Sequence, residues 1–220
     1  MKVTNGKYRG LGRWVGVAAA AAASLLAASQ FNATIISGAV TSGGVAVFVK
    51  LPVPLTGSTP FNTVGQDNFN SPNLFGFDES QNTTLTSSLT PDFGATLSSG
   101  TTVASHYVFF DPQSGRVTGT VNFDSIILAV LSSTVKLQAT DYLANTGVNY
   151  LNPGLRGLEA VDVVSFAGTQ LTINFTASSP GDYVRVLTAF SPGAVPEPGS
   201  VALVGVALFG MGAVARRRRA

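Results

Sequence analysis

The chain contains one histidine, and this limits the acid–base chemistry that it can perform. His106 lies in the apolar run His106-Tyr107-Val108-Phe109-Phe110. A Ser–His–acid triad would have to use this imidazole as its general base. The chain has no G-x-S-x-G motif to present a nucleophile, and a lone histidine in a strand-like run is more often structural. We therefore expect no triad and no catalytic residue.

Carboxylates are the other chemically capable groups. Paired acids could hydrolyse glycosides, but their separation cannot be read from the sequence, and most acids here lie at turns, where Asp is favoured for backbone reasons. Asp67, Asp78 and Glu79 lie in Asn-rich segments and offer hard oxygens, which makes them weak candidates for calcium ligands. Asx turns are the more common explanation for such residues. No EF-hand or calcium-binding repeat is present, and we expect no cofactor.

Cysteine is absent from the chain. The absence excludes a thiol nucleophile, iron–sulfur ligation and zinc-finger ligation, and the single histidine excludes a histidine-rich metal site. A body of about 165 residues can bury a sufficient core without disulfides.

The N-terminus has the layout of a secretory signal peptide over residues 1–29. A positively charged start, with Lys2, Lys7, Arg9 and Arg13, precedes an apolar run over residues 14–28 that ends in small residues. Cleavage is expected after Ala28 or Ser29. An uncleaved N-terminal anchor is the alternative, and the short run disfavours it.

The C-terminus has three parts in a fixed order. Pro196-Glu197-Pro198 follows a spacer over residues 191–195, residues 199–215 carry no charge, and Arg216, Arg217, Arg218 and Arg219 close the segment. Seventeen helical residues cover about 25 Å, slightly less than a bilayer core. The arginines mark the cytoplasmic side, so the preceding chain is expected across the membrane from the cytoplasm.

This tail closely resembles the PEP-CTERM sorting signal of Gram-negative bacteria. The resemblance implies recognition of Pro196, Glu197 and Pro198 by an exosortase, which is a membrane-embedded, transpeptidase-like Cys protease. It also implies an inner-membrane precursor with a periplasmic domain, then cutting near the motif and delivery to the cell surface or extracellular matrix. The two prolines would hold the segment extended for a protease cleft. An ordinary tail anchor is the alternative.

Charge separates the two termini from the body. Eight of the 13 basic residues lie in the termini, which leaves residues 30–194 with five basic and ten acidic side chains and a net charge of −5. The alkaline pI of the whole chain therefore reflects targeting, and no nucleic-acid partner is expected.

The body, residues 30–190, is predicted to be one all-β domain of the β-sandwich or jelly-roll type. Residues 171–177 and 116–123 alternate between apolar and polar side chains, which is typical of strands with one wet face. Gly119 interrupts the second run and marks an expected bulge. Further strands are predicted at 45–49, 103–110, 126–131, 163–166 and 183–187, of which 45–49, 126–131 and 163–166 read as buried on both faces.

Between these runs the chain carries turn-forming residues. Long surface loops are expected at 51–63 and 66–80, and a short helix near 140–143. A domain found in PEP-CTERM proteins is resembled by the segments 75–82, 104–112, 150–159 and 177–188. The resemblance implies export, and no functional residue is carried over from it.

These observations lead us to expect a non-enzymatic, exported surface or extracellular-matrix protein. The family resemblance implies an exosortase and the extracellular polysaccharide of a biofilm as partners, and residues 199–215 are expected to contact the membrane during transit. A carbohydrate-binding module is the alternative. It would need an exposed aromatic platform, for which the candidates are Tyr107, Tyr142, Tyr150 and Tyr183. A secreted hydrolase is a second and weaker alternative to the expected function.

Overall fold

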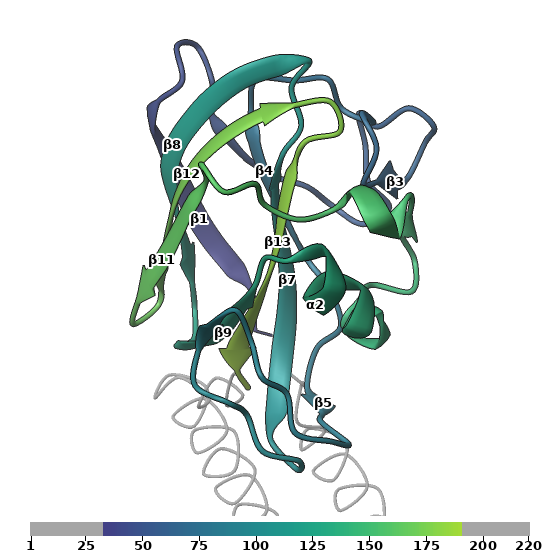
Figure 1. Cartoon of the computed structure of the whole chain (residues 1–220), viewed down its shortest axis with the longest axis vertical. Helices are drawn as coiled ribbons and strands as arrows, with labels where there is room; N and C mark the ends of the chain where they lie inside the picture. Colours follow the sequence, from purple (N-terminus) through teal and green to yellow (C-terminus); the bar gives the residue numbers. More distant parts are fainter. Residues whose placement is uncertain (1–32, 191–220) are drawn as a thin grey trace, which may run out of the picture. The chain divides into compact units, whose positions relative to one another are not determined.

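The computed structural model describes residues 33–190, which form an all-β domain with little helix (Figure 1). This confirms the prediction that the body of the chain is all-β. The predictions for residues 1–29 and for the tail from residue 191 onward lie outside the described residues. No helix within residues 33–190 is long and apolar enough to cross a membrane.

One sheet has four antiparallel strands. Their order across the sheet is β1 (Ile35–Ser42), β8 (Ser114–Phe123), β12 (Gln170–Ser178) and β11 (Val163–Ala167). β12 and β8 pair along nine consecutive positions. The bulge expected in β8 at Gly119 lies instead in the neighbouring strand, because the register of β1 shifts just after Val40, the residue opposite Gly119, whereas β8 pairs with β12 without interruption.

The second sheet has seven strands. Its order is β2 (Phe48–Lys50), β4 (Leu74–Asp78), β7 (Thr102–Phe110), β13 (Asp182–Ala189), β9 (Ile127–Leu131) and β6 (Phe93–Gly94), with β5 (Thr83–Thr84) paired to β7. β2 and β4 are parallel, whereas the other pairs are antiparallel. A separate parallel pair joins β3 (Thr63–Val64) to β10 (Asn149–Tyr150).

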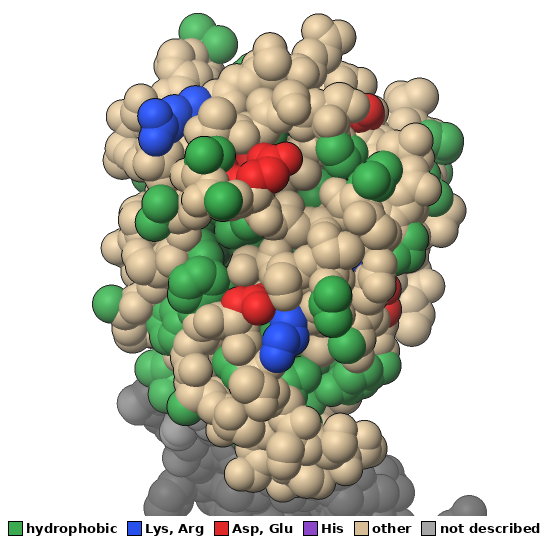
Figure 2. Space-filling model, viewed as in Figure 1, with side chains coloured by type: hydrophobic (Ala, Val, Ile, Leu, Met, Phe, Trp, Pro, Cys, Tyr) green, Lys and Arg blue, Asp and Glu red, His purple; other side chains and the backbone are tan. Residues whose placement is uncertain are grey.

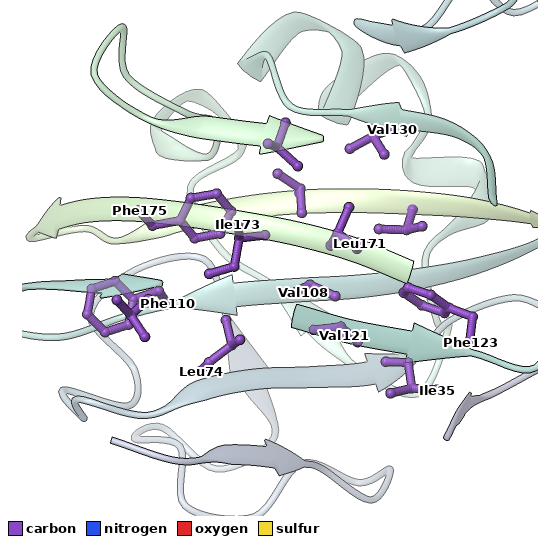
Figure 3. Close-up of a cluster of buried hydrophobic side chains, with 14 of the residues drawn as sticks. Ile35, Leu74, Val108, Phe110, Val121, Phe123, Val130, Leu171, Ile173 and Phe175 are labelled. Atoms are coloured by element: carbon purple, nitrogen blue, oxygen red, sulfur yellow. The ribbon is translucent and has the colours of Figure 1, made fainter. Parts of the chain in front are cut away.

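The two larger sheets face each other across one hydrophobic core. β12 contributes its alternate residues Leu171, Ile173 and Phe175, and these meet residues such as Val108 and Phe110 from β7 (Figure 3). The opposite residues of β12 are exposed, apart from Asn174, which is partly buried. Each large apolar side chain fully buried in this way stabilises the fold by about 1.5–3 kcal/mol, so period-two alternation fixes which face of β12 turns inward.

The other face of the seven-stranded sheet is covered as well. Tyr107, Phe109 and Tyr183 belong to a second core cluster. It lies under α2 (Thr134–Ala139), the 3₁₀ turn η2 (Asp141–Leu143) and the irregular segments before β4, whereas a second 3₁₀ turn, η3 (Pro153–Leu155), has no buried residue. Figure 1 shows β1, β8, β11 and β12 on one side of β7 and β13, and α2 on the other. The central strands β7 and β13 are therefore buried on both faces.

The structure corrects the predicted loop at residues 66–80. The segment Leu74–Asp78 is strand β4, which lies between β2 and β7 in the seven-stranded sheet. Leu74, Phe75 and Phe77 are buried. The sequence did not predict this strand, because Asn, Asp and Gly dominate the composition of residues 66–80. The short apolar run within them contributes side chains to both hydrophobic cores. Strand β1 was not predicted, because its residues are mostly small and polar.

Two of the three strands predicted to be buried on both faces have an exposed face. Val45 is 88% exposed and precedes β2, and Val163 at the start of β11 is 56% exposed. The prediction is confirmed for the third strand, β9, because Val130 belongs to the core between the sheets and Leu131 to the second core. β2 and β11 are edge strands of their sheets. A short apolar run cannot reveal whether a second layer covers its outer face. The predicted helix near 140–143 corresponds to η2, and α2 directly precedes it.

Candidate functional site

Strand β4 ends at Asp78, and Asp78 and the following Glu79 contact different parts of the molecule. Asp78 pairs with His106 and Lys50, whose nitrogens lie 2.8 Å from its two carboxylate oxygens. The backbone N–H of Ile35 also donates to Asp78, at 3.0 Å. Burial raises the pKa of Asp78, but the hydrogen bonds and charge of His106 and Lys50 outweigh it and hold this pKa below its usual range. Asp78 is thus a paired anion that links β1, β2 and β7.

His106 is the centre of an acid–imidazole–hydroxyl chain. Its Nδ1 lies 2.8 Å from Asp78 Oδ1, and its Nε2 lies 3.0 Å from the hydroxyl of Thr188. The connectivity is that of a nucleophilic triad. However, His106 and Thr188 are fully buried, and the imidazole packs 4.9 Å from the ring of Phe123. A substrate has no access to this hydroxyl. The role of the Asp78–His106–Thr188 hydrogen bonds is therefore structural, because they join strands β4, β7 and β13.

Glu79 points into the second core, where it meets Arg185. Arg185 Nε and Nη2 donate to the two carboxylate oxygens of Glu79 at 2.7 and 2.9 Å, and both side chains are fully buried. The hydroxyls of Ser105 and Tyr150 each donate to Glu79 at 2.6 Å. Because every oxygen of the carboxylate is paired, the cost of burying its charge is offset by four hydrogen bonds.

The same arginine joins the helical layer to the sheet. Arg185 Nη1 donates to the carbonyl of Leu137 at 3.0 Å and to the hydroxyl of Thr140 at 2.8 Å, both at the C-terminal end of α2. Arg156 forms a two-pronged pair with Asp141, at 3.0 and 2.6 Å. Sequence reasoning missed this network. Its one local signal is an arginine inside the apolar run of β13.

A cleft of about 440 Å³ opens beside the acids of β4. Its polar lining includes Lys50, Asp78, Gln81 and Asn145. Lys50 donates to Asp78, Thr34 and the carbonyl of Ile35, and the side-chain NH₂ of Asn145 donates to the carbonyl of Asp78. These groups hold the cleft wall in place.

The three predicted calcium candidates do not share one site. Asp78 and Glu79 face different cationic partners, as described above. Asp67 accepts a hydrogen bond from the hydroxyl of Ser179 and lies near the buried Asp111. Burial raises the pKa of Asp111 to about 6, and the charge of Asp67 adds to the effect, against hydrogen bonds from the backbone N–H groups of Phe69 and Asn68. Calcium at Asp67 stays a prediction, with Asp111 as a neighbour that the sequence did not single out.

The four tyrosines proposed as a carbohydrate platform do not form one exposed surface. Tyr107 and Tyr183 are fully buried and stack at a ring distance of 5.9 Å in the second core. Tyr150 is bonded to Glu79, and only Tyr142, which is 52% exposed, faces solvent. The four rings therefore form no flat surface on which a sugar could stack.

The described residues thus form an all-β domain with a buried ion pair between Glu79 and Arg185. Residues 194–219 match the PEP-CTERM protein-sorting motif. The chain thus carries the sorting motif that its tail predicts, and it is an exported, membrane-anchored precursor sorted to the cell surface, with an exosortase as the kind of processing partner. No curated protein and no solved structure gives a significant match to the chain.

Proposed function

We propose that this chain is a non-enzymatic protein of the cell surface or extracellular matrix, and that its β domain associates with exopolysaccharide in a biofilm. The sorting motif at residues 194–219 carries the proposal, because it addresses the domain to that environment. The two-layer arrangement of sheets supports a scaffold of the sandwich type.

Side-chain chemistry within residues 33–190 supports the non-enzymatic part. The imidazole of His106 and the hydroxyl of Thr188 are buried, and the carboxylates of Asp78 and Glu79 are bonded to cationic partners. Hydrolysis of a glycoside or an ester needs an acid or base that can reach the substrate. These groups instead maintain the packing of strands and helical layer.

The sorting step is tested by changing Glu197 to Ala in the native host. Glu197→Ala leaves the apolar span and the arginines intact, so insertion should survive while processing fails. The unprocessed protein should then accumulate in the membrane fraction at higher mass. Ser200→Ala, within the apolar span, is the matched control and should mature normally. A Glu197→Ala protein that matures and leaves the membrane like wild type would show that the tail is a plain anchor.

Replacing Arg216–Arg219 by serine separates orientation from recognition. The change removes the positive-inside signal but keeps Pro196-Glu197-Pro198. Retention and orientation should weaken, which protease protection of the β domain in spheroplasts would report.

The matrix association is tested by fractionating a biofilm before and after digestion of its polysaccharide by glycosidases. The mature protein should sediment with the intact matrix and be released by digestion. Protein that remains in the culture medium whether or not polysaccharide is present would contradict the association.

A further inference from the structure

Three carboxylates outside the cleft converge at the start of β13. Glu159 and Asp162 come from the segment between η3 and β11, and Asp182 is the first residue of β13. One oxygen of each residue lies within 4.8 Å of the others. Figure 2 shows acidic side chains gathered over the segment between η3 and β11. Three like charges at this spacing repel one another unless a cation or a proton lies among them.

Asp182 gives the second, independent observation. It is only 1% exposed, and its Oδ2 is buried without a hydrogen-bond donor in the described part of the chain. None of the ion pairs among residues 33–190 includes Glu159, Asp162 or Asp182. A buried carboxylate oxygen without a partner is costly, in contrast to Glu79, whose oxygens are all paired.

Asp162 is held in position by the backbone. Its Oδ1 accepts the N–H of Thr176 at 2.7 Å, and its Oδ2 accepts the N–H of Glu159 at 2.9 Å. Each carboxylate oxygen has a second lone pair, so these bonds orient the group without using up its capacity as a ligand. Glu159 is exposed and Asp162 is partly buried, so an ion can enter from solvent while Asp182 forms the floor.

We propose that Glu159, Asp162 and Asp182 bind a divalent cation, and that the cation is Ca²⁺. Oxygens bound to one Ca²⁺ at 2.3–2.6 Å lie at most about 5 Å apart, which matches the spacing here. An all-carboxylate donor set suits a hard cation and disfavours zinc or copper. Three carboxylates supply three to six of the required oxygens, and water completes the shell. The bound ion ties the loop before β11 to the start of β13.

A proton is the competitor of the cation at this site. Burial, together with the charges of Asp162 and Glu159, raises the pKa of Asp182 to about 8. A neutral Asp182 would relieve the repulsion without metal. Calcium binding must then release this proton, so the apparent affinity should rise with pH.

The test uses the full chain in detergent, freed of metal with EDTA and dialysed into buffer at pH 7.5. Calorimetric titration with CaCl₂ should show one site with submillimolar Kd. Calcium at about a hundredfold excess over Kd should raise the Tm by about 5–10 °C. Asp182→Asn should weaken binding at least tenfold. Glu159→Gln, at an exposed position that does not threaten folding, should also weaken it.

Asp67→Asn is the matched control, because Asp67 and the neighbouring Asp111, like Asp182, each keep a buried oxygen without a hydrogen bond among the described residues. It separates the site at Asp182 from the calcium candidate at Asp67, and it should leave binding by Glu159, Asp162 and Asp182 unchanged. Calcium binding that is lost in Asp67→Asn and kept in Glu159→Gln would overturn the proposal and place the ion elsewhere. No heat and no change of Tm at 10 mM CaCl₂ would overturn it too, and would mean that the three carboxylates share a proton only.

Discussion

At the scale of single residues, the buried polar groups divide into paired and unpaired ones. Glu79 and Arg185 satisfy each other, whereas Asp111 keeps one buried oxygen without a hydrogen bond among the described residues. Removing one member of a buried pair should lower the free energy of unfolding strongly, because the other member stays buried without a partner. Groups with raised pKa should make stability depend on pH.

Removing Arg185 should be among the most damaging single changes. Arg185→Met leaves the Glu79 carboxylate buried without a cation, which should lower the free energy of unfolding by about 3–5 kcal/mol. Urea denaturation measures the loss. Arg116→Met, on the exposed face of β8, is the control and should change stability by less than about 0.5 kcal/mol. The double variant Glu79→Gln/Arg185→Met should lose less than Arg185→Met. Equal losses in Arg185→Met and Arg116→Met would contradict the assigned role.

Asp111 should make the fold less stable as pH rises through about 6. Its folded pKa, raised by burial and by the facing Asp67, lies above the unfolded value of about 4, so the folded state binds the extra proton. Between pH 5 and 7 this group should withdraw about 1.4 kcal/mol of stability. Tyr183, also facing it, stays neutral throughout this range because burial raises its pKa.

The measurement compares urea midpoints of wild type and Asp111→Asn at pH 5, 6 and 7. Asn cannot ionise, so the variant should gain stability relative to wild type with each step upward in pH. A difference that does not vary with pH would show that Asp111 titrates in its ordinary range. The contribution of Asp78 to stability has the opposite pH dependence. Because its pKa is lowered in the folded state, Asp78 contributes stability that is lost only as pH falls below about 4.

At the scale of elements, the close approach of β1 and β8 depends on a glycine. A Cβ at Gly119 would lie 2.5 Å from the carbonyl oxygen of Ala39, which is backbone and cannot rotate away. The contact lies at the bulge in β1, so pairing of this edge strand relies on the absence of a side chain.

Gly119→Ala should therefore displace β1 and lower stability by about 1–3 kcal/mol. Gly115→Ala is the matched control on the same strand, because its Cβ would meet only the ring of Phe110, at an ordinary 3.7 Å. Thermal melts of both variants decide the matter. If Gly115→Ala proves the more damaging, the close approach of β1 is not what Gly119 serves.

At the scale of the whole molecule, the described residues contain two cores that share the same central strands. β7 and β13 contribute one face to the inter-sheet core and the other to the core under α2. Neither core can be lost without exposing a face of these strands. We expect one cooperative transition rather than separate loss of the helical layer.

The tyrosines allow this expectation to be measured. Tyr107, Tyr150 and Tyr183 lie in or against the second core, so near-UV circular dichroism follows that layer, while the strand-dominated far-UV signal follows the sheets. Both signals should vanish at the same urea concentration, with or without reducing agent, because the chain has no cysteine. An earlier loss of the tyrosine signal would mean that the helical layer detaches first.

The sequence by itself determined the features that depend on neighbours along the chain. Alternation in β8 and β12 predicts both the strands and their inward faces, because side chains alternate across a strand whatever its partners. The sorting motif of the tail also depends only on neighbours along the chain, because it consists of Pro196-Glu197-Pro198, the apolar span and the arginines in that order. His106 was correctly placed inside a strand, because its whole run is apolar and β-forming.

Only the tertiary structure decided which distant residues meet. Arg185 and Glu79 are 106 positions apart, and Asp182 meets Glu159 and Asp162 only because β13 starts beside the segment that leads into β11. The exposure of β11 and the burial of β4 were likewise set by sheet order, which places one at an edge and the other between β2 and β7. Sheet register and layer packing act between segments far apart in the chain, so the local pattern carries no record of them.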